Sequence, residues 1–246
     1  MGAMQYSGQA LGNLDFQFGP DALQDRASEA SFPLLSANLR LKAGGGSPSF
    51  ATPFAVKDVK GLKVGLIGLT PLTTPQSNVP KNTEDFDFLP YAQALTEVIP
   101  QARAAGADLI VVFSRLCRSD LMEFLPVAKQ LGVSMVAGGF CGETIAEVTD
   151  GVALVSPKFR FSSYGKVRIR VRKNSKEVLE ILTEVKDNAG GVDDEEVKVF
   201  IDKWSHLAEE ELARVVGYVN DAIPNGTPAL HNLVMDSWLH AYPADI

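Results

Sequence analysis

Two oxygen-bearing side chains near the start of the chain have a spacing that suits a cation site. Asn13 and Asp15 are separated by a single residue, and amide and carboxylate oxygens are ligands that hard divalent metals accept. Two such ligands make only part of a site, because these cations take about six oxygen ligands or more. The structural alternative is that Asn13 caps a turn and Asp15 pairs with a local neighbour.

The remaining metal-binding residue types do not complete this site. The chain has two cysteines, Cys117 and Cys141, and three histidines, His206, His231 and His240, all of which fall in its last fifth. Two thiols without a nearby histidine do not form a zinc site. We therefore expect Cys117 and Cys141 to be buried free thiols. A disulfide is the alternative if their Cα atoms lie within about 7 Å.

The segment around Asn13 resembles a known catalytic motif. Residues 12–19 read Gly-Asn-Leu-Asp-Phe-Gln-Phe-Gly, which is similar to the Gly-Asn-His-Glu-Phe-Asp-x-Gly signature of the 5′-nucleotidase branch of the calcineurin-like metallophosphoesterase superfamily. Residues 31–39, 61–70 and 108–116 are similar to the strands that follow this signature, in the same order. The resemblance implies an α/β fold, a metallophosphoesterase-like sandwich of mixed β-sheets flanked by helices and followed by a long C-terminal helix.

Enzymes of that family hold two divalent metals on Asp, His and Asn side chains, and the ions activate water and stabilise the phosphoryl charge. Asn13 stands at a metal-ligand position, whereas Leu14 replaces the histidine that assists the leaving group. Arg115 replaces the histidine of a Ser-His-Leu motif, and Phe140 and Gly142 replace two histidines of a Gly-Gly-His-x-His motif. None of these four replacements ligates a cation. The resemblance therefore implies a degenerate site with no catalytic residue, no bound metal and no other cofactor.

The family geometry implies that the altered motifs surround one remnant pocket. Its expected members are Asn13, Asp15, Arg115, Cys117, Phe140, Cys141 and Glu143. We expect Arg115 to pair with Asp15 or Glu143, because oxygen ligands gathered around cations repel one another once the cations are gone. The alternatives are an Arg115 side chain that reaches solvent, and a pocket that binds nucleotide or phosphate without hydrolysing it.

Composition excludes several classes of function. The 246-residue chain carries a formal net charge of −7, which disfavours a nucleic-acid partner, since phosphate backbones are bound chiefly by lysine and arginine. A basic strand face at residues 166–172 would suit an anionic partner, and a solvated face is its alternative. No apolar run of about 18 residues indicates a membrane span. The first residues do not resemble a secretory signal, although the family resemblance suggests a periplasmic or extracytoplasmic location.

Short apolar runs alternate with helical spacing, which predicts an α/β domain. The expected strands cover residues 33–39, 54–59, 63–69, 109–113, 134–137, 164–172 and 177–185. The expected helices cover residues 21–30, 91–105 and 120–131, with a long acidic-capped helix from about 193 to about 222. Residues 1–7 resemble the helix that precedes the signature.

We expect two parts in the chain. Residues 1–186 form a metallophosphoesterase-like domain that is incomplete at its N-terminus, and residues 187–246 hold a linker, the long helix and the remnant start of the family's C-terminal domain. The hypothesis for function is a catalytically inactive structural or interaction module that works with a protein partner or a second copy. The rival is a metal-dependent phosphoester hydrolase acting on nucleotides, whose missing site parts come from an absent segment or a partner.

Overall fold

The computed structural model describes residues 1–215, 217–218 and 220–241. The chain divides into two compact units, Met1–Asp193 and Asp194–Ile246. Residues 216, 219 and 242–246 lie outside the described residues. The expected long helix and the expected second part of the chain both include some of them.

A six-stranded mixed sheet forms the centre of the first unit. Its strands, in spatial order, are β4 (Phe54–Val59), β5 (Leu62–Leu69), β7 (Leu109–Ser114), β8 (Val133–Ala137), β10 (Val152–Ser156) and β9 (Ile145–Thr149). The four inner strands are parallel, and the two outer strands pair antiparallel to their neighbours. The carboxyl ends of β5, β7, β8 and β10 therefore lie at one edge of the sheet.

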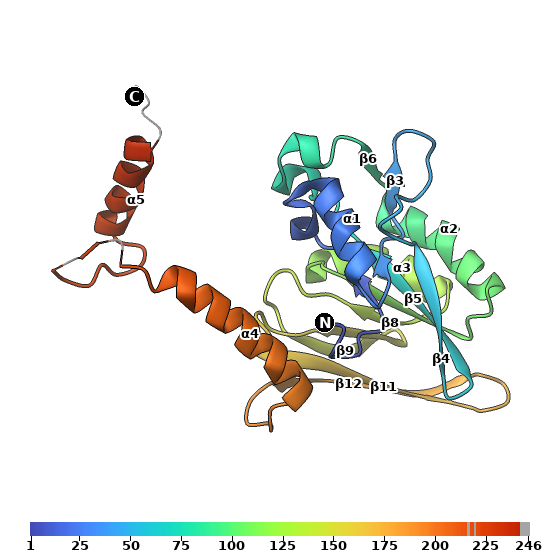
Figure 1. Ribbon diagram of the computed structural model, residues 1–246. Coiled ribbons are helices and arrows are strands. Elements are labelled where there is room, and N and C mark those ends of the chain that lie inside the picture. The colour runs from blue at the N-terminus through green and yellow to red at the C-terminus, as the bar shows by residue number, and fades with distance from the viewer. Residues whose placement is uncertain (216, 219, 242–246) are drawn as a thin grey trace. The chain divides into compact units, whose positions relative to one another are not determined.

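The inner strands are apolar along their length because both faces of the sheet are covered. In β7, Ile110 and Val112 pack in the layer under α2 (Tyr91–Ala104) and α3 (Arg118–Gln130), whereas Leu109 and Val111 pack in the opposite layer. That opposite layer is closed by the antiparallel ribbon of β11 (Ser163–Val171) and β12 (Val178–Asp187), seen below the sheet in Figure 1. This mixed sheet flanked by helices confirms the predicted fold class.

Smaller elements close the N-terminal side of the unit. They are β1 (Gln9–Ala10), which pairs with β2 (Leu34–Leu35), β3 (Leu39–Leu41), which pairs with β6 (Phe86–Phe88), the helix α1 (Gly19–Glu29), and the 3-10 turns η1 (Asn13–Phe16), η2 (Pro75–Ser77) and η3 (Pro80–Asn82). Phe16 of η1 is fully buried and meets the rings of Phe50, Phe86 and Phe88 edge-on. This aromatic cluster holds η1 in place.

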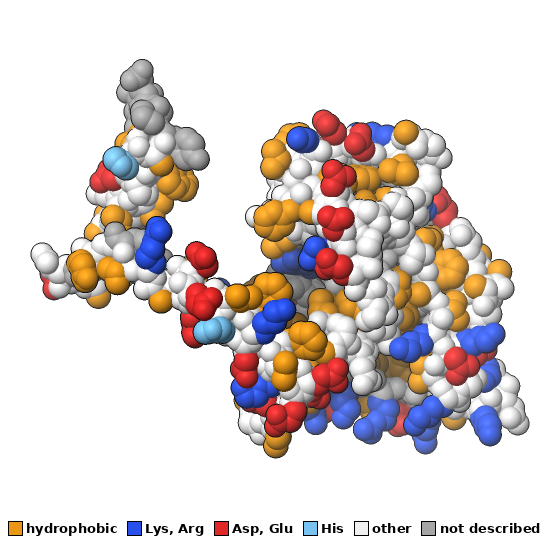
Figure 2. All heavy atoms as spheres, in the orientation of Figure 1, with side chains coloured by type: hydrophobic (Ala, Val, Ile, Leu, Met, Phe, Trp, Pro, Cys, Tyr) orange, Lys and Arg blue, Asp and Glu red, His pale blue; other side chains and the backbone are white. Residues whose placement is uncertain are grey.

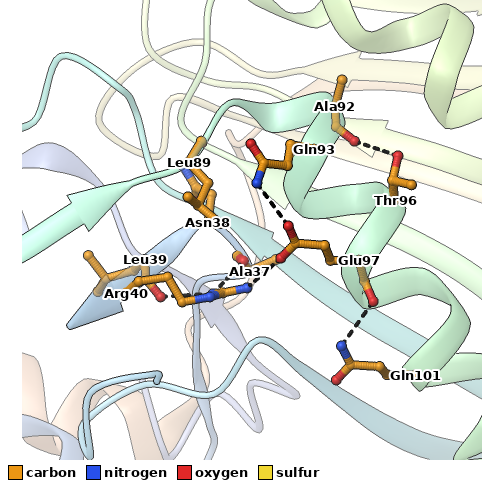
Figure 3. A network of polar contacts seen from close by, with 10 residues as sticks. All are labelled: Ala37, Asn38, Leu39, Arg40, Leu89, Ala92, Gln93, Thr96, Glu97 and Gln101. Atoms are coloured by element: carbon orange, nitrogen blue, oxygen red, sulfur yellow. Dashed lines mark hydrogen bonds and ion pairs between the residues drawn. The ribbon is translucent and has the colours of Figure 1, made fainter. Parts of the chain in front are cut away.

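Polar contacts connect Asn38 with the end of β5 and connect β3 with α2, and Figure 3 shows the side of this network that reaches α2. The Asn38 side chain accepts a hydrogen bond from the Thr70 backbone N–H at 2.8 Å and donates to the Thr70 carbonyl at 2.9 Å. Next to it, the Arg40 guanidinium donates to the Ala37 carbonyl at 2.8 Å and faces the Glu97 carboxylate at 3.4 Å. These bonds satisfy backbone groups that the strand ladders leave unpaired.

The predicted basic face of β11 is largely matched by acidic residues on β12. Cross-strand pairs join Lys166 to Glu184 at 3.1 Å and Arg170 to Glu180 at 3.4 Å. Figure 2 shows lysine and arginine side chains along the lower rim of the first unit, where Figure 1 places the ribbon. The ribbon is therefore a solvated, charge-paired face, which was the alternative to an anion-binding surface.

The second unit contains two helices, α4 (Glu195–Leu212) and α5 (Pro228–Ala241). The Asp194 side chain caps α4 by accepting the backbone N–H groups of Glu196 and Val197 at 3.1 Å. The expected extension of this helix to about residue 222 is wrong, because α4 ends at Leu212, ahead of the weak helix formers Val215 and Gly217. Within the described residues, every helix is too short or too polar to cross a bilayer.

Three local predictions differ from the structure. Residues 1–7 form turns and not the expected helix. The expected strand 33–39 is interrupted, because it holds the two-residue strand β2 and only the first residue of β3. The β9–β10 hairpin was missed, although its turn has a recognisable signal. Asp150 and Gly151 both have positive φ, 53° and 83°, and an Asp-Gly pair between apolar runs favours a two-residue hairpin turn.

Candidate functional site

Two loops at the carboxyl edge of the sheet carry most of the predicted site residues. Arg115 follows β7 directly, and residues 138–144 follow β8. The loops are joined by a hydrogen bond from the Gly139 N–H to the Leu116 carbonyl at 3.1 Å. Because β7 and β8 are parallel neighbours, residues far apart in sequence meet at this edge.

The N-terminal motif lies against the same loops. Gly12 donates its backbone N–H to Asp15 Oδ2 at 2.6 Å, which closes the η1 turn. A Cβ atom on residue 12 would lie only 2.7 Å from Arg115 Cδ, so glycine is needed for the approach of the arginine side chain. Asp15 and Arg115 are therefore brought near one another, but the expected ion pair between them is not among the ion pairs of the described residues.

The Arg115 guanidinium has different neighbours from those expected. Its Cζ lies over the Phe140 ring, 5.5 Å from the centroid, in cation–π contact. The proposed pairing with Glu143 is wrong, because Glu143 faces Arg118 at 4.0 Å. Among the described residues Arg115 forms no ion pair within 4.0 Å and acts on Asp15 only through its charge.

Asp15 occupies an unfavourable place for a carboxylate. Burial raises its pKa above the ordinary value of 3.8, while the hydrogen bond from Gly12 and the charge of Arg115 act in the opposite direction. A raised folded-state pKa means that the stability associated with this group is fully present below pH 3.8 and is lost as pH rises through the folded pKa. At neutral pH the ionised side chain therefore destabilises the fold.

Asp15→Asn is accordingly expected to raise the free energy of unfolding at pH 7, with a smaller gain at pH 3.5. Asparagine retains an acceptor for the Gly12 N–H and removes the buried charge. Urea melts of both proteins at the two pH values measure the difference. Asp25→Asn, on the exposed side of α1, is the matched control, with a change of less than about 0.5 kcal/mol. Equal gains for Asp15→Asn at both pH values would contradict this account.

Cys117 and Cys141 form a disulfide, with their Cα atoms 5.3 Å apart. The expectation of free thiols is therefore wrong. Cys117 precedes α3 on the loop after β7, and Cys141 lies on the loop after β8. The parallel pairing of β7 and β8 brings these two loops together, which sequence spacing alone does not reveal.

The residues present do not fit a pair of divalent metals. Asn13 is buried, with 5% of its surface exposed, and its Oδ1 has no hydrogen-bond partner among the described residues. The Asn78 Nδ2 donates to the Asn13 carbonyl at 2.8 Å, and Asn78 Oδ1 is also unpartnered. Within the described part of the chain, no three His, Cys, Asp or Glu side chains converge as a metal-binding group. Two amide oxygens alone make a poor donor set for two dications.

Three further residues at this edge were not predicted from the sequence. Arg118 donates to Glu147 at 2.7 Å and so joins α3 to β9. The Phe159 ring packs against Gly142, where a Cβ atom would clash with it. Arg118 and Glu147 gave no sequence signal because their pairing depends on the missed β9–β10 hairpin.

Comparison with known proteins finds relatives that are named as nucleotide phosphoesterases. No protein-family model matches the chain. The 2′,3′-cyclic-nucleotide 2′-phosphodiesterase/3′-nucleotidase of Haemophilus influenzae is 31% identical over 132 residues, which cover 49% of this chain and 19% of that protein. The chain thus spans about one fifth of the length of this relative.

Solved structures show the same fold. A 5′-nucleotidase precursor from Thermus thermophilus matches with a TM-score of 0.75 at 22% identity, covering 97% of this chain and 52% of that chain. The calcineurin-like phosphoesterase YfkN from Bacillus subtilis matches with a TM-score of 0.74 at 21% identity, covering 87% and 74%.

Proposed function

We propose that this chain, which belongs to the calcineurin-like phosphoesterase superfamily, does not hydrolyse phosphoesters and acts as a structural or interaction module. The observation that carries the proposal is Arg115. Its guanidinium lies against Gly12 and over Phe140, at the edge where the resembling enzymes hold their metals. Fold membership alone assigns no activity, so the proposal depends on these side chains.

The chemistry of the substituted positions supports a non-catalytic role. A guanidinium remains protonated at all physiological pH values and offers only donors, so it competes with a cation and does not ligate one. Leu14, at the leaving-group position, is 48% exposed and has no proton to donate. General acid assistance typically contributes about 10²- to 10⁴-fold to such reactions.

Exposed apolar side chains support a role in association. Phe18 and Phe161 of the first unit are 83% and 68% exposed, and Trp204 of α4 is 65% exposed. Large aromatic residues are enriched in protein interfaces and depleted from freely solvated surfaces. The partner proposed is another protein or a second copy of this chain.

Association with a partner is expected to raise the mass of the native species above that of the single polypeptide. Native mass spectrometry of the protein purified gently from its own cells should show a species heavier than its own polypeptide, with the excess mass identifying a second copy or another subunit. The same sample under denaturing conditions gives the mass of the polypeptide alone and is the reference. A single monomeric species in the native sample would contradict the interaction role.

The alternative function is a metal-dependent nucleotide hydrolase completed by another segment or a partner. The names of the relatives and the unpartnered, buried Asn13 Oδ1 favour it. Elemental analysis of the native assembly separates the two proposals. The alternative requires about two equivalents of a divalent metal that are lost in Asn13→Ala, whereas a non-catalytic module retains no stoichiometric metal at this site.

A further inference from the structure

We propose that the Cys117–Cys141 disulfide is redox-active: it exchanges with a dithiol oxidoreductase of the thioredoxin class, and its reduction releases residues 140–144 of the loop after β8. The site lies at the carboxyl edge of the sheet, beside Arg115 and Phe140. This redox activity is independent of the proposed function, because it requires neither that the chain is catalytic nor that it is inactive.

The two cysteine residues differ in exposure. Cys141 is an exposed residue on the loop after β8, and Cys117 is half-buried immediately before α3. An attacking thiolate needs an open approach to the sulfur that it attacks. Because Cys141 is the more exposed residue, we assign its Sγ as the point of attack and Cys117 as the leaving group.

Cys117 is placed to leave as a thiolate. It is the N-cap residue of the 13-residue helix α3, and the N-terminus of a helix carries partial positive charge that stabilises a thiolate. Arg115 and Arg118 flank it in sequence, and Arg118 is already paired with Glu147. The Asp120 carboxylate opposes this effect in part, and it accepts the Cys117 backbone N–H at 3.1 Å.

The loop depends on the disulfide for its position. At its start, Gly138 donates to the Val155 carbonyl at 2.9 Å and Gly139 donates to the Leu116 carbonyl. Residues 140–144, all described, make no further backbone hydrogen bonds. They also make the Arg115–Phe140 stacking, the packing of Phe159 on Gly142, and the 4.0 Å approach of Glu143 to Arg118. Reduction therefore leaves residues 140–144 without a cross-link and without a backbone–backbone hydrogen bond.

The exchange balances as a two-electron transfer. A thiolate of the dithiol attacks Cys141 Sγ and forms a mixed disulfide, while the Cys117–Cys141 bond breaks and Cys117 departs as a thiolate that takes up a proton. The second thiol of the reductant then loses its proton and attacks its own mixed-disulfide sulfur, which releases Cys141. The chain gains two thiols, and the dithiol becomes a disulfide.

The test uses a thioredoxin whose second active-site cysteine is replaced by serine, so that the mixed disulfide persists. Peptide mass spectrometry of the native, oxidised protein is expected to find thioredoxin on Cys141 at least tenfold more often than on Cys117. The Cys117→Ser/Cys141→Ser double variant is the control and should form no adduct. Intact thioredoxin with its reductase should reduce the native protein without change in its circular dichroism.

Hydrogen exchange then tests the conformational part. Amides of residues 140–144 are expected to exchange at least tenfold faster in the reduced protein, with β7 and β8 unchanged. The proposal is overturned if the purified, air-exposed protein contains two free thiols. It is also overturned if the adduct forms mainly on Cys117, if reduction requires unfolding in urea, or if the loop exchanges equally in both redox states.

Discussion

Replacing Asn38 with leucine is expected to lower the free energy of unfolding by about 3–5 kcal/mol. The Asn38 side chain is fully buried. It bonds both the N–H and the carbonyl of Thr70 and reaches the Leu89 carbonyl at 3.4 Å (Figure 3 shows the Leu89 side of the network). Leucine has the same branching and the same number of heavy atoms but no polar atoms, so the Thr70 backbone groups would stay buried without partners, at about 1–3 kcal/mol each.

Chemical denaturation at neutral pH measures this loss. Gln93→Ala is the matched control from the same network, because the Gln93 side chain is exposed and its one hydrogen bond within the described residues goes to Glu97, at 2.9 Å. Its effect should stay within about 0.5 kcal/mol. A loss of less than about 1 kcal/mol for Asn38→Leu would show that this network does not hold the end of β5 in place.

The Cys117→Ser/Cys141→Ser variant is expected to lose about 3–4 kcal/mol relative to the oxidised protein. The disulfide closes a loop with a sequence separation of 24, and the entropy of closing such a loop in the unfolded chain gives stabilisation of this size. Urea melts of the oxidised wild type, the reduced wild type and the double variant provide the comparison.

The reduced wild type is the internal control, because reduction removes the cross-link and adds only one hydrogen to each sulfur atom. It should melt within about 0.5 kcal/mol of the double variant. If oxidised and reduced wild type have the same midpoint, the disulfide contributes nothing to stability, and the loop-closure argument does not apply to this fold.

The sheet could be predicted from the sequence wherever the pattern was long and apolar. Residues 63–69 and 109–113 were expected as covered strands and appear as β5 and β7, because only a strand buried on both faces carries so continuous an apolar run. The β9–β10 hairpin was missed because β9 alternates weakly, with Ala146 and Val148 exposed beside Glu147. Its Asp150–Gly151 turn was the signal to follow.

The site could be predicted only in part. The resemblance located the loops after β7 and β8, and the closeness of Asp15 to Arg115 follows from it. The partners of the long side chains could not be predicted, because Glu143 has Arg118 within reach from the first turn of α3, and sequence position does not determine side-chain direction. The sequence analysis favoured free thiols and kept the disulfide as the alternative. The distance of two cysteines along the chain does not reveal that their Cα atoms lie 5.3 Å apart in space.

One measurement tests the central claim of a non-catalytic site most directly. It is the steady-state hydrolysis of a nucleoside monophosphate and of a nitrophenyl phosphate ester by the purified protein, with saturating manganese, against Asn13→Ala. The account predicts that both proteins release phosphate at the rate of the buffer blank. Turnover about 10²-fold or more above the blank, abolished by Asn13→Ala, would contradict it and establish a working metal-dependent hydrolase.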